Sequence, residues 1–255
     1  MFAIYKKELR SYFITPIGYV YLGVFLALSA LLCCYSTLLQ SNYDTSTYFT
    51  LLIISFIILI PLLTMKLFAE DKKLRTEQLL LTAPVSLWGL VLGKFFAAAT
   101  LFGGSVLVSC LNFIPLYLYA NEERLALAQA YGEAVANEAD IGPITGAIFA
   151  CVIGILLIGL VFISLGLLIS SLTENQLSAA VITVAIIFGM LILDLVNSFI
   201  NVYAIRFVIS WFGILSHFAN FSAGILDYAS ILYYLSLSGI FLLLTVRVYD
   251  KRRWG

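Results

Sequence analysis

Long apolar runs separated by short charged segments place the strongest limit on how this chain can fold. As an α-helix, about 20 consecutive apolar residues cover the roughly 30 Å hydrocarbon core of a bilayer. The runs that we expect to cross are 17–39, 48–68, 94–119, 144–171, 176–199 and 228–248. Only 11% of the residues are charged, against about 25% in soluble domains. The sequence therefore predicts an all-α membrane protein with six transmembrane helices, forming a single domain over 1–255.

The lysines and arginines are distributed unevenly about these runs. All but two of the 14 basic residues precede the first run, lie between the second and third, or occur in and after the sixth. The two exceptions are Arg124 and Arg206. By the positive-inside rule, both termini and the segment between the second and third runs are expected to be cytoplasmic.

The N-terminal segment 1–15 has a pattern typical of an interfacial helix. At helical spacing, one side is apolar and the other is basic. The apolar side comprises Phe2, Tyr5, Leu9, Tyr12 and Phe13, and the basic side Lys6, Lys7 and Arg10. We expect this helix to lie on the cytoplasmic surface, with its basic side toward anionic headgroups.

The densest charge cluster lies between the second and third runs, from Lys66 to Lys94. Because it is charged, we expect it to sit in water as an amphipathic helix over 70–82, where Asp71 and Arg75 form an i,i+4 pair with the acid first. Pro84 would end this helix, since proline lacks an N–H and restricts the residue before it. The pattern predicts a cytosolic element that offers charges to a soluble partner.

Two connections on the expected outer side leave alternatives open. Residues 207–226 are uncharged and nearly long enough to cross, but polar residues dilute them. We interpret 200–226 as short helices that dip into the outer leaflet, since a seventh crossing would place the basic C-terminus outside. We interpret the acidic, Ala-rich segment 120–143 as a solvated outer loop; a vestibule that attracts cations is the alternative.

Polar residues within and beside the fifth run are candidates for a substrate pathway. Asp194 is the one carboxylate within an apolar run, and Asn197 and Asn201 continue its face. These three residues could line a substrate pathway, or they could pack beneath the expected dip. In the turn before this run, Thr173 and Gln176 have the spacing of a capping box.

The sequence lacks the motifs of nucleotide, metal and nucleic-acid binding. The pattern GxxxxGK[ST] is absent, so we expect no ATP or Mg²⁺ site in this chain and no enzymatic activity of its own. The four cysteines fall in apolar runs without metal-ligand spacing, and we assign them to packing. No basic patch with interleaved aromatic residues indicates nucleic-acid binding.

Two stretches, KKELRSYFITPIGYV at the start and FAEDKKLRTEQLLLTAPVSLWGLVLGKF after the second run, carry a family resemblance. Together with the six-span layout, they resemble ABC-2 type transporter permeases, most closely the gliding-motility and nitrous-oxide-accessory branch. The resemblance implies that 70–82 is a coupling helix seated on an ABC ATPase subunit and that 173–177 makes a smaller contact. The contact residues that we carry over are Glu70, Asp71, Lys72, Lys73, Arg75, Thr76, Glu77, Thr173, Glu174 and Asn175.

The resemblance also implies a set of partners and a location. We expect two ATPase copies that bind ATP and Mg²⁺, a second permease forming a homodimer or heterodimer, and an auxiliary membrane or extracytoplasmic protein. The assembly would be an exporter in the cytoplasmic membrane of a bacterium, with an unidentified substrate. The alternatives are a secondary carrier without an ATPase, for which midplane ionisable residues and repeats are lacking, and a non-transporting scaffold for an ATPase.

Overall fold

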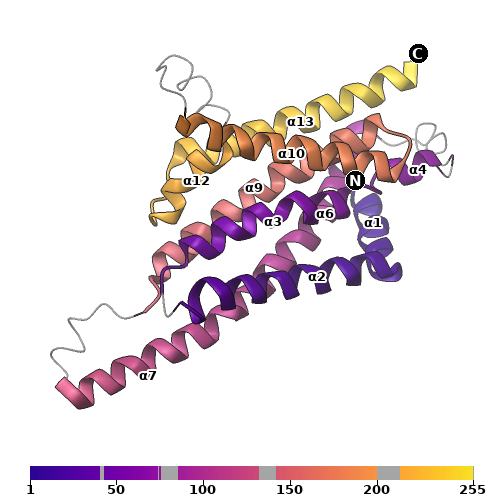
Figure 1. Ribbon diagram of the computed structural model, residues 1–255. Coiled ribbons are helices and arrows are strands. Elements are labelled where there is room, and N and C mark those ends of the chain that lie inside the picture. The colour runs from indigo at the N-terminus through magenta and orange to yellow at the C-terminus, as the bar shows by residue number, and fades with distance from the viewer. Residues whose placement is uncertain (41–42, 74, 76–85, 132–141, 200–212, 255) are drawn as a thin grey trace.

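The computed structural model describes the chain except for residues 41–42, 74, 76–85, 132–141, 200–212 and 255. The described residues form helices and no strands (Figure 1). The helices are α1 (Phe2–Ile14), α2 (Pro16–Cys33) with the π-helical turn η1 (Cys34–Leu38), α3 (Ser46–Thr64), α4 (Ala69–Lys73), α6 (Leu87–Ser109), η2 (Cys110–Asn112), α7 (Phe113–Tyr131), α9 (Thr145–Leu172), α10 (Gln176–Phe199), α12 (Ile214–Ser222) and α13 (Tyr228–Trp254).

Within the described residues, six helical stretches are long and apolar enough to cross a membrane, which confirms the predicted all-α class and the six spans. The most buried of them is α9, which packs against α3, α6, α10, α12 and α13. Close packing around α9 depends on glycine: a Cβ on Gly159 would lie 2.0 Å from the Phe102 ring, and one on Gly166 would lie 2.2 Å from the Thr64 hydroxyl. A helix buried to this extent is expected to be apolar around most of its circumference.

The third span is much longer than predicted. It begins at Leu87, where the Ser86 side chain accepts a hydrogen bond from the Gly89 N–H at 3.1 Å, and it continues through η2 to Tyr131. These 45 residues extend over roughly 67 Å at 1.5 Å per residue. The interpretation of 120–131 as loop was therefore wrong, because the Ala-rich segment continues the helix; in Figure 1, α7 projects away from the other helices. Residues 132–141 lie outside the described part.

The predicted N-terminal helix is present as α1, which crosses the end of the bundle and packs against α6 and α2 (Figure 1). The corner between α1 and α2 is tight, since a Cβ on Gly18 would lie 2.2 Å from the Tyr12 carbonyl oxygen. Tyr12 is buried by this corner and donates a hydrogen bond from its hydroxyl to the Leu63 carbonyl at 2.9 Å. Both ends of the chain, α1 and α4 lie at the same end of the bundle (Figure 1).

The segment before the last span contains a short helix, as predicted. α12 has nine residues and is roughly 14 Å long, too short to cross about 30 Å of hydrocarbon. It packs on α9 and α10, with the Phe218 and Phe221 rings against Gly154. The described part of 207–226 thus forms a short helix on the bundle and gives no support to a seventh span.

Candidate functional site

The charged segment after α3 forms a shorter helix than predicted. α4 covers Ala69–Lys73, and Arg75 follows with φ at 55°, a left-handed conformation that ends the α-helix. The expected continuous helix over 70–82 is therefore interrupted at Arg75, and the i,i+4 geometry of Asp71 and Arg75 is lost. Residues 76–85, including Thr76, Glu77 and Pro84, lie outside the described residues.

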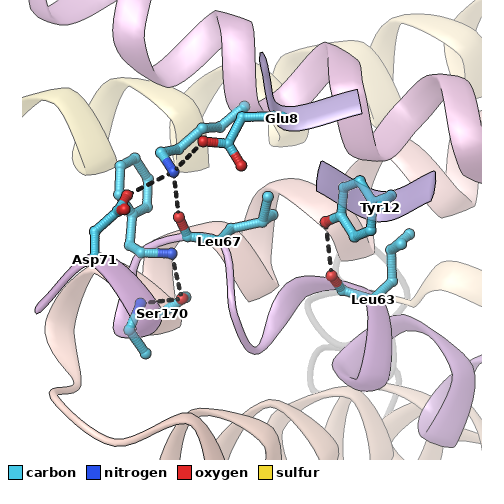
Figure 2. Close-up of polar contacts among 9 residues, drawn as sticks. Glu8, Tyr12, Leu63, Leu67, Asp71 and Ser170 are labelled. Carbon is cyan, nitrogen blue, oxygen red and sulfur yellow. Dashed lines mark hydrogen bonds and ion pairs between the residues drawn. The ribbon is translucent and has the colours of Figure 1, made fainter. Parts of the chain in front are cut away.

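A buried lysine joins α4 to two other helices. Lys94, on α6, is only 1% exposed, and its ammonium lies 2.7 Å from Asp71 Oδ2 and 2.9 Å from Glu8 Oε1. The same ammonium donates to the Leu67 carbonyl at 2.5 Å. Figure 2 shows Glu8 and Asp71 approaching this group from different elements. We call Glu8, Asp71 and Lys94 the lysine clamp; it joins α1, α4 and α6.

The expectation that the whole charged cluster sits in water was wrong for Lys94 and for Lys66. Lys66 is 5% exposed and donates to Thr15 Oγ1 at 3.1 Å, with its ammonium 4.7 Å from the centre of the Tyr12 ring. Burial raises the pKa of the Tyr12 hydroxyl well above its usual value, and the Glu8 carboxylate acts in the same direction. Both lysines can be buried because oxygen atoms or an aromatic face surround the ammonium.

The start of α4 is tied to the end of α9 by one hydroxyl group. Ser170 Oγ accepts hydrogen bonds from the N–H groups of Phe68 and Ala69, at 3.0 and 3.1 Å, and donates to the Met65 carbonyl at 3.2 Å (Figure 2). These backbone groups lie in the turn before α4 and at its first residue. Groups at the start of a helix have no hydrogen-bond partner within the helix. Ser170 thus replaces a local cap with a contact between distant segments.

Lys72 makes a second tie between α4 and α9. Its ammonium donates to the Ser171 carbonyl and, at 3.0 Å, to the Thr173 carbonyl. The last carbonyls of a helix carry partial negative charge and lack intrahelical partners, so a lysine there is favourable. Thr173, at the start of the segment 173–177 that is predicted to make a second contact with the partner, therefore lies beside α4.

The remaining predicted contact residues differ in accessibility. Glu70 is partly buried, whereas Lys73 and Arg75 are exposed at the end of α4, and Glu174 and Asn175 are exposed in the turn. Asp71 and Lys72 are instead engaged in contacts within the chain. The described site therefore exposes Lys73, Arg75, Glu174 and Asn175, whereas Asp71 and Lys72 hold this surface in place.

The predicted capping box is replaced by a different cap. The Thr173 hydroxyl donates back to the Ile169 carbonyl of α9 at 3.0 Å. Asn175 Oδ1 accepts from the Leu177 N–H at 3.2 Å and so caps the start of α10. An asparagine side chain commonly accepts a hydrogen bond from the N–H two residues later. Asn175 therefore caps α10 in place of the predicted Thr173 and Gln176 capping box.

Sequence reasoning missed Glu8 and Ser170 and misplaced Lys94. Glu8 had a signal that could have been used, because it is the only carboxylate within the basic segment 1–15. A single acid in a basic amphipathic helix suggests a partner lysine elsewhere. Ser170 had no such signal, since a serine in a buried helix normally donates to its own backbone.

Asp194 lies at the opposite end of the bundle and contacts α12. Its carboxylate accepts hydrogen bonds from the Leu215 N–H at 2.7 Å and the Ser216 N–H at 3.3 Å. A Cβ on the N-cap residue Gly213 would lie 2.0 Å from Asp194 Oδ1. This geometry favours the packing alternative over a pathway role for Asp194. Asn197 has its Oδ1 buried without a partner in the described structure, and Asn201 lies outside it.

Replacing Asp194 with alanine is expected to loosen the start of α12. The Leu215 and Ser216 N–H groups would lose their acceptor, at a cost of about 1 kcal/mol. Hydrogen exchange at these two amides should accelerate, while exchange in α9 stays unchanged. Asp194→Asn keeps one acceptor oxygen and should show a smaller effect; unchanged exchange in Asp194→Ala would contradict the capping role.

The charged groups of this site connect several helices. Among the described residues, no group of three His, Cys, Asp or Glu side chains could hold a metal ion. The charged groups around α4 pair with one another and with backbone carbonyls, which fixes the positions of α1, α4, α6 and α9 relative to one another. What they leave exposed is a small polar surface at the end of the bundle.

Comparison with known families gives one match that spans nearly the whole chain. The family described as ABC-2 family transporter protein matches residues 2–253. No curated protein matches the chain significantly.

Proposed function

Because the chain belongs to the ABC-2 family of transporter proteins, and is thus a membrane transport subunit of an ABC transporter, we propose that it is an exporter permease driven by a separate ATPase. The observation that carries this proposal is the anchoring of α4. A five-residue charged helix would not hold its position alone, since short helices are marginal in water. Here the lysine clamp, Ser170 and Lys72 fix it to the spans α6 and α9 and to the flanking helix α1.

In the proposed mechanism, the ATPase grips the exposed residues at the end of α4 and in the turn between α9 and α10. Closure of the ATPase subunits on ATP displaces α4. Because α4 is tied to α6 through Lys94 and to the end of α9 through Lys72 and Ser170, the displacement moves these helices as rigid bodies. Different contacts of the surface with the two ATPase states supply the free-energy coupling.

The proposed assembly has two permeases and two ATPases in the cytoplasmic membrane of a bacterium, with ATP and Mg²⁺ bound by the ATPases. The end that carries both termini and α4 faces the cytosol, in line with the positive-inside rule. A second permease copy or a related permease completes the translocation path, and α7 is available to an auxiliary protein on the outer side.

The proposal is tested by isolating the tagged chain from its own membrane in mild detergent. We expect an ABC ATPase to co-purify, and its hydrolysis rate to change when the permease is present. A variant that reverses the exposed charges Lys73, Arg75 and Glu174 should lose the ATPase. Its control reverses Glu122 and Arg124 on α7, at the other end of the bundle, and should keep it.

The outcome also separates the alternatives. A secondary carrier would purify without any ATPase, and a scaffold would retain the ATPase without moving any cargo in reconstituted vesicles. Retention of the ATPase by the charge-reversed variant would contradict the proposed docking surface even if the family assignment stands.

A further inference from the structure

A groove of about 400 Å³ lies between the start of α6 and the last turns of α13, apart from the lysine clamp. Its α6 wall is formed by Leu87 and Trp88. Its α13 wall is a stripe of residues at helical spacing: Leu243, Val246, Arg247, Asp250 and Arg253. The two helices pack against each other, and their ends lie at the end of the bundle that carries both termini.

The groove changes from apolar to basic along α13. Leu243 and Val246 line the part nearer the middle of the span, and Arg247 and Arg253 follow toward the end of the helix. The Arg247 side chain is 80% exposed, and its ion-pair partner among the described residues, Asp250, has a carboxylate oxygen 3.9 Å away. An exposed pair at this distance is weak, so the Arg247 guanidinium remains able to bind an anion.

The α6 wall adds two features that suit an amphiphile at a membrane surface. Trp88 is 46% exposed, and tryptophan is enriched at the level of lipid headgroups. α6 also begins here, and the N–H groups in the first turn of a 23-residue helix carry partial positive charge.

The neighbouring surface identifies the occupant. Leu243 and Ile240, one turn earlier, are each about half exposed on a helix apolar enough to cross the membrane. The apolar part of the groove is therefore continuous with a surface that faces acyl chains. Its basic part lies at the level of the lipid headgroups. A ligand that fills both parts needs an acyl chain joined to an anionic group.

We propose that this groove binds one anionic phospholipid, with its phosphate group at Arg247 and Arg253 and its glycerol backbone and first acyl carbons against Trp88 and Leu243. Basic pockets between spans on the cytoplasmic side are suited to such headgroups. The site is independent of ATPase docking, since its lining residues differ from those of the α4 surface. Binding there would hold the ends of α6 and α13 together.

The experiment is native mass spectrometry of the detergent-solubilised full chain with equal amounts of phosphatidylglycerol and phosphatidylcholine that carry the same acyl chains. We expect one phosphatidylglycerol per chain to be retained, with a preference over phosphatidylcholine of about 30-fold from the two arginines. Arg247→Gln with Arg253→Gln should abolish this preference. Asp250→Asn, which removes the one carboxylate among the described lining residues, should increase it.

The control is Lys251→Gln with Arg252→Gln, which removes the same charge from adjacent positions outside the groove lining. It should keep the preference if the groove is the site. Equal loss of preference in the control and in the groove variant would overturn the proposal in favour of general surface charge. Displacement of the lipid by inorganic phosphate at millimolar concentration would also overturn it, because a free anion would then suffice.

Discussion

Replacing Lys94 with methionine is expected to lower the free energy of unfolding by about 3–5 kcal/mol, the range found when one partner of a buried ion pair is removed. Methionine fills the space of the lysine stem but supplies no charge. The Glu8 and Asp71 carboxylates, each bound to Lys94 at under 3 Å, would then face each other with no cation between them. Equilibrium unfolding of the purified chain in mixed micelles measures the loss.

Two further variants distinguish the stability lost with the lysine clamp from the effect of removing any positive charge. Lys73→Met removes an exposed lysine from the same segment and should change stability by less than about 0.5 kcal/mol. The triple variant Glu8→Gln, Asp71→Asn, Lys94→Met removes all three charges and should recover much of the loss, because neutral replacements of buried charges are often tolerated. A stable Lys94→Met single variant would contradict the clamp.

Replacing Ser170 with alanine is expected to cost roughly 3 kcal/mol or more. The change leaves the N–H groups of Phe68 and Ala69 and the Met65 carbonyl without their partner in a buried site. Each unsatisfied buried group costs about 1–3 kcal/mol. In the proposed mechanism the variant also reduces the response of the co-purified ATPase to the permease, because α4 is held less firmly.

The neighbouring serine provides the control. Ser171 is as buried as Ser170, but among the described residues its hydroxyl donates only to the Leu168 carbonyl of its own helix. That carbonyl belongs to the helix ladder, so Ser171→Ala should be nearly neutral. The backbone carbonyl of Ser171, which accepts from Lys72, is kept in this variant. Similar losses from both substitutions would show that the site depends on serine volume and not on the bridging hydroxyl.

The spans could be predicted from the sequence because apolar length is a local property. Each predicted run corresponds to a helical stretch that is long and apolar enough to cross. The end of the third span was missed for the same reason, since the solvated residues of α7 continue the helix without being apolar. Helix propensity, which is high for the Ala, Glu and Leu of this segment, would have been the better guide there.

The environment of the charged residues could not be predicted in this way. Lys94 follows a charged segment and was placed in water, yet α1 folds back across the start of α6 and covers it. The contact joins residues 86 positions apart. Asp194 shows the same limit: its role depends on α12, which lies 20 residues further along the chain and is positioned by tertiary packing. Periodicity identifies a face of a helix but not what lies opposite it.

The order of the lysine clamp along the chain bears on how the protein is made. Both counterions of Lys94, at positions 8 and 71, are synthesised before the lysine itself, so each is present when α6 leaves the ribosome. The ammonium can be neutralised as its helix enters the bilayer, without waiting for any later segment. A nascent chain whose first helix is deleted would insert α6 with only the Asp71 carboxylate to neutralise its lysine.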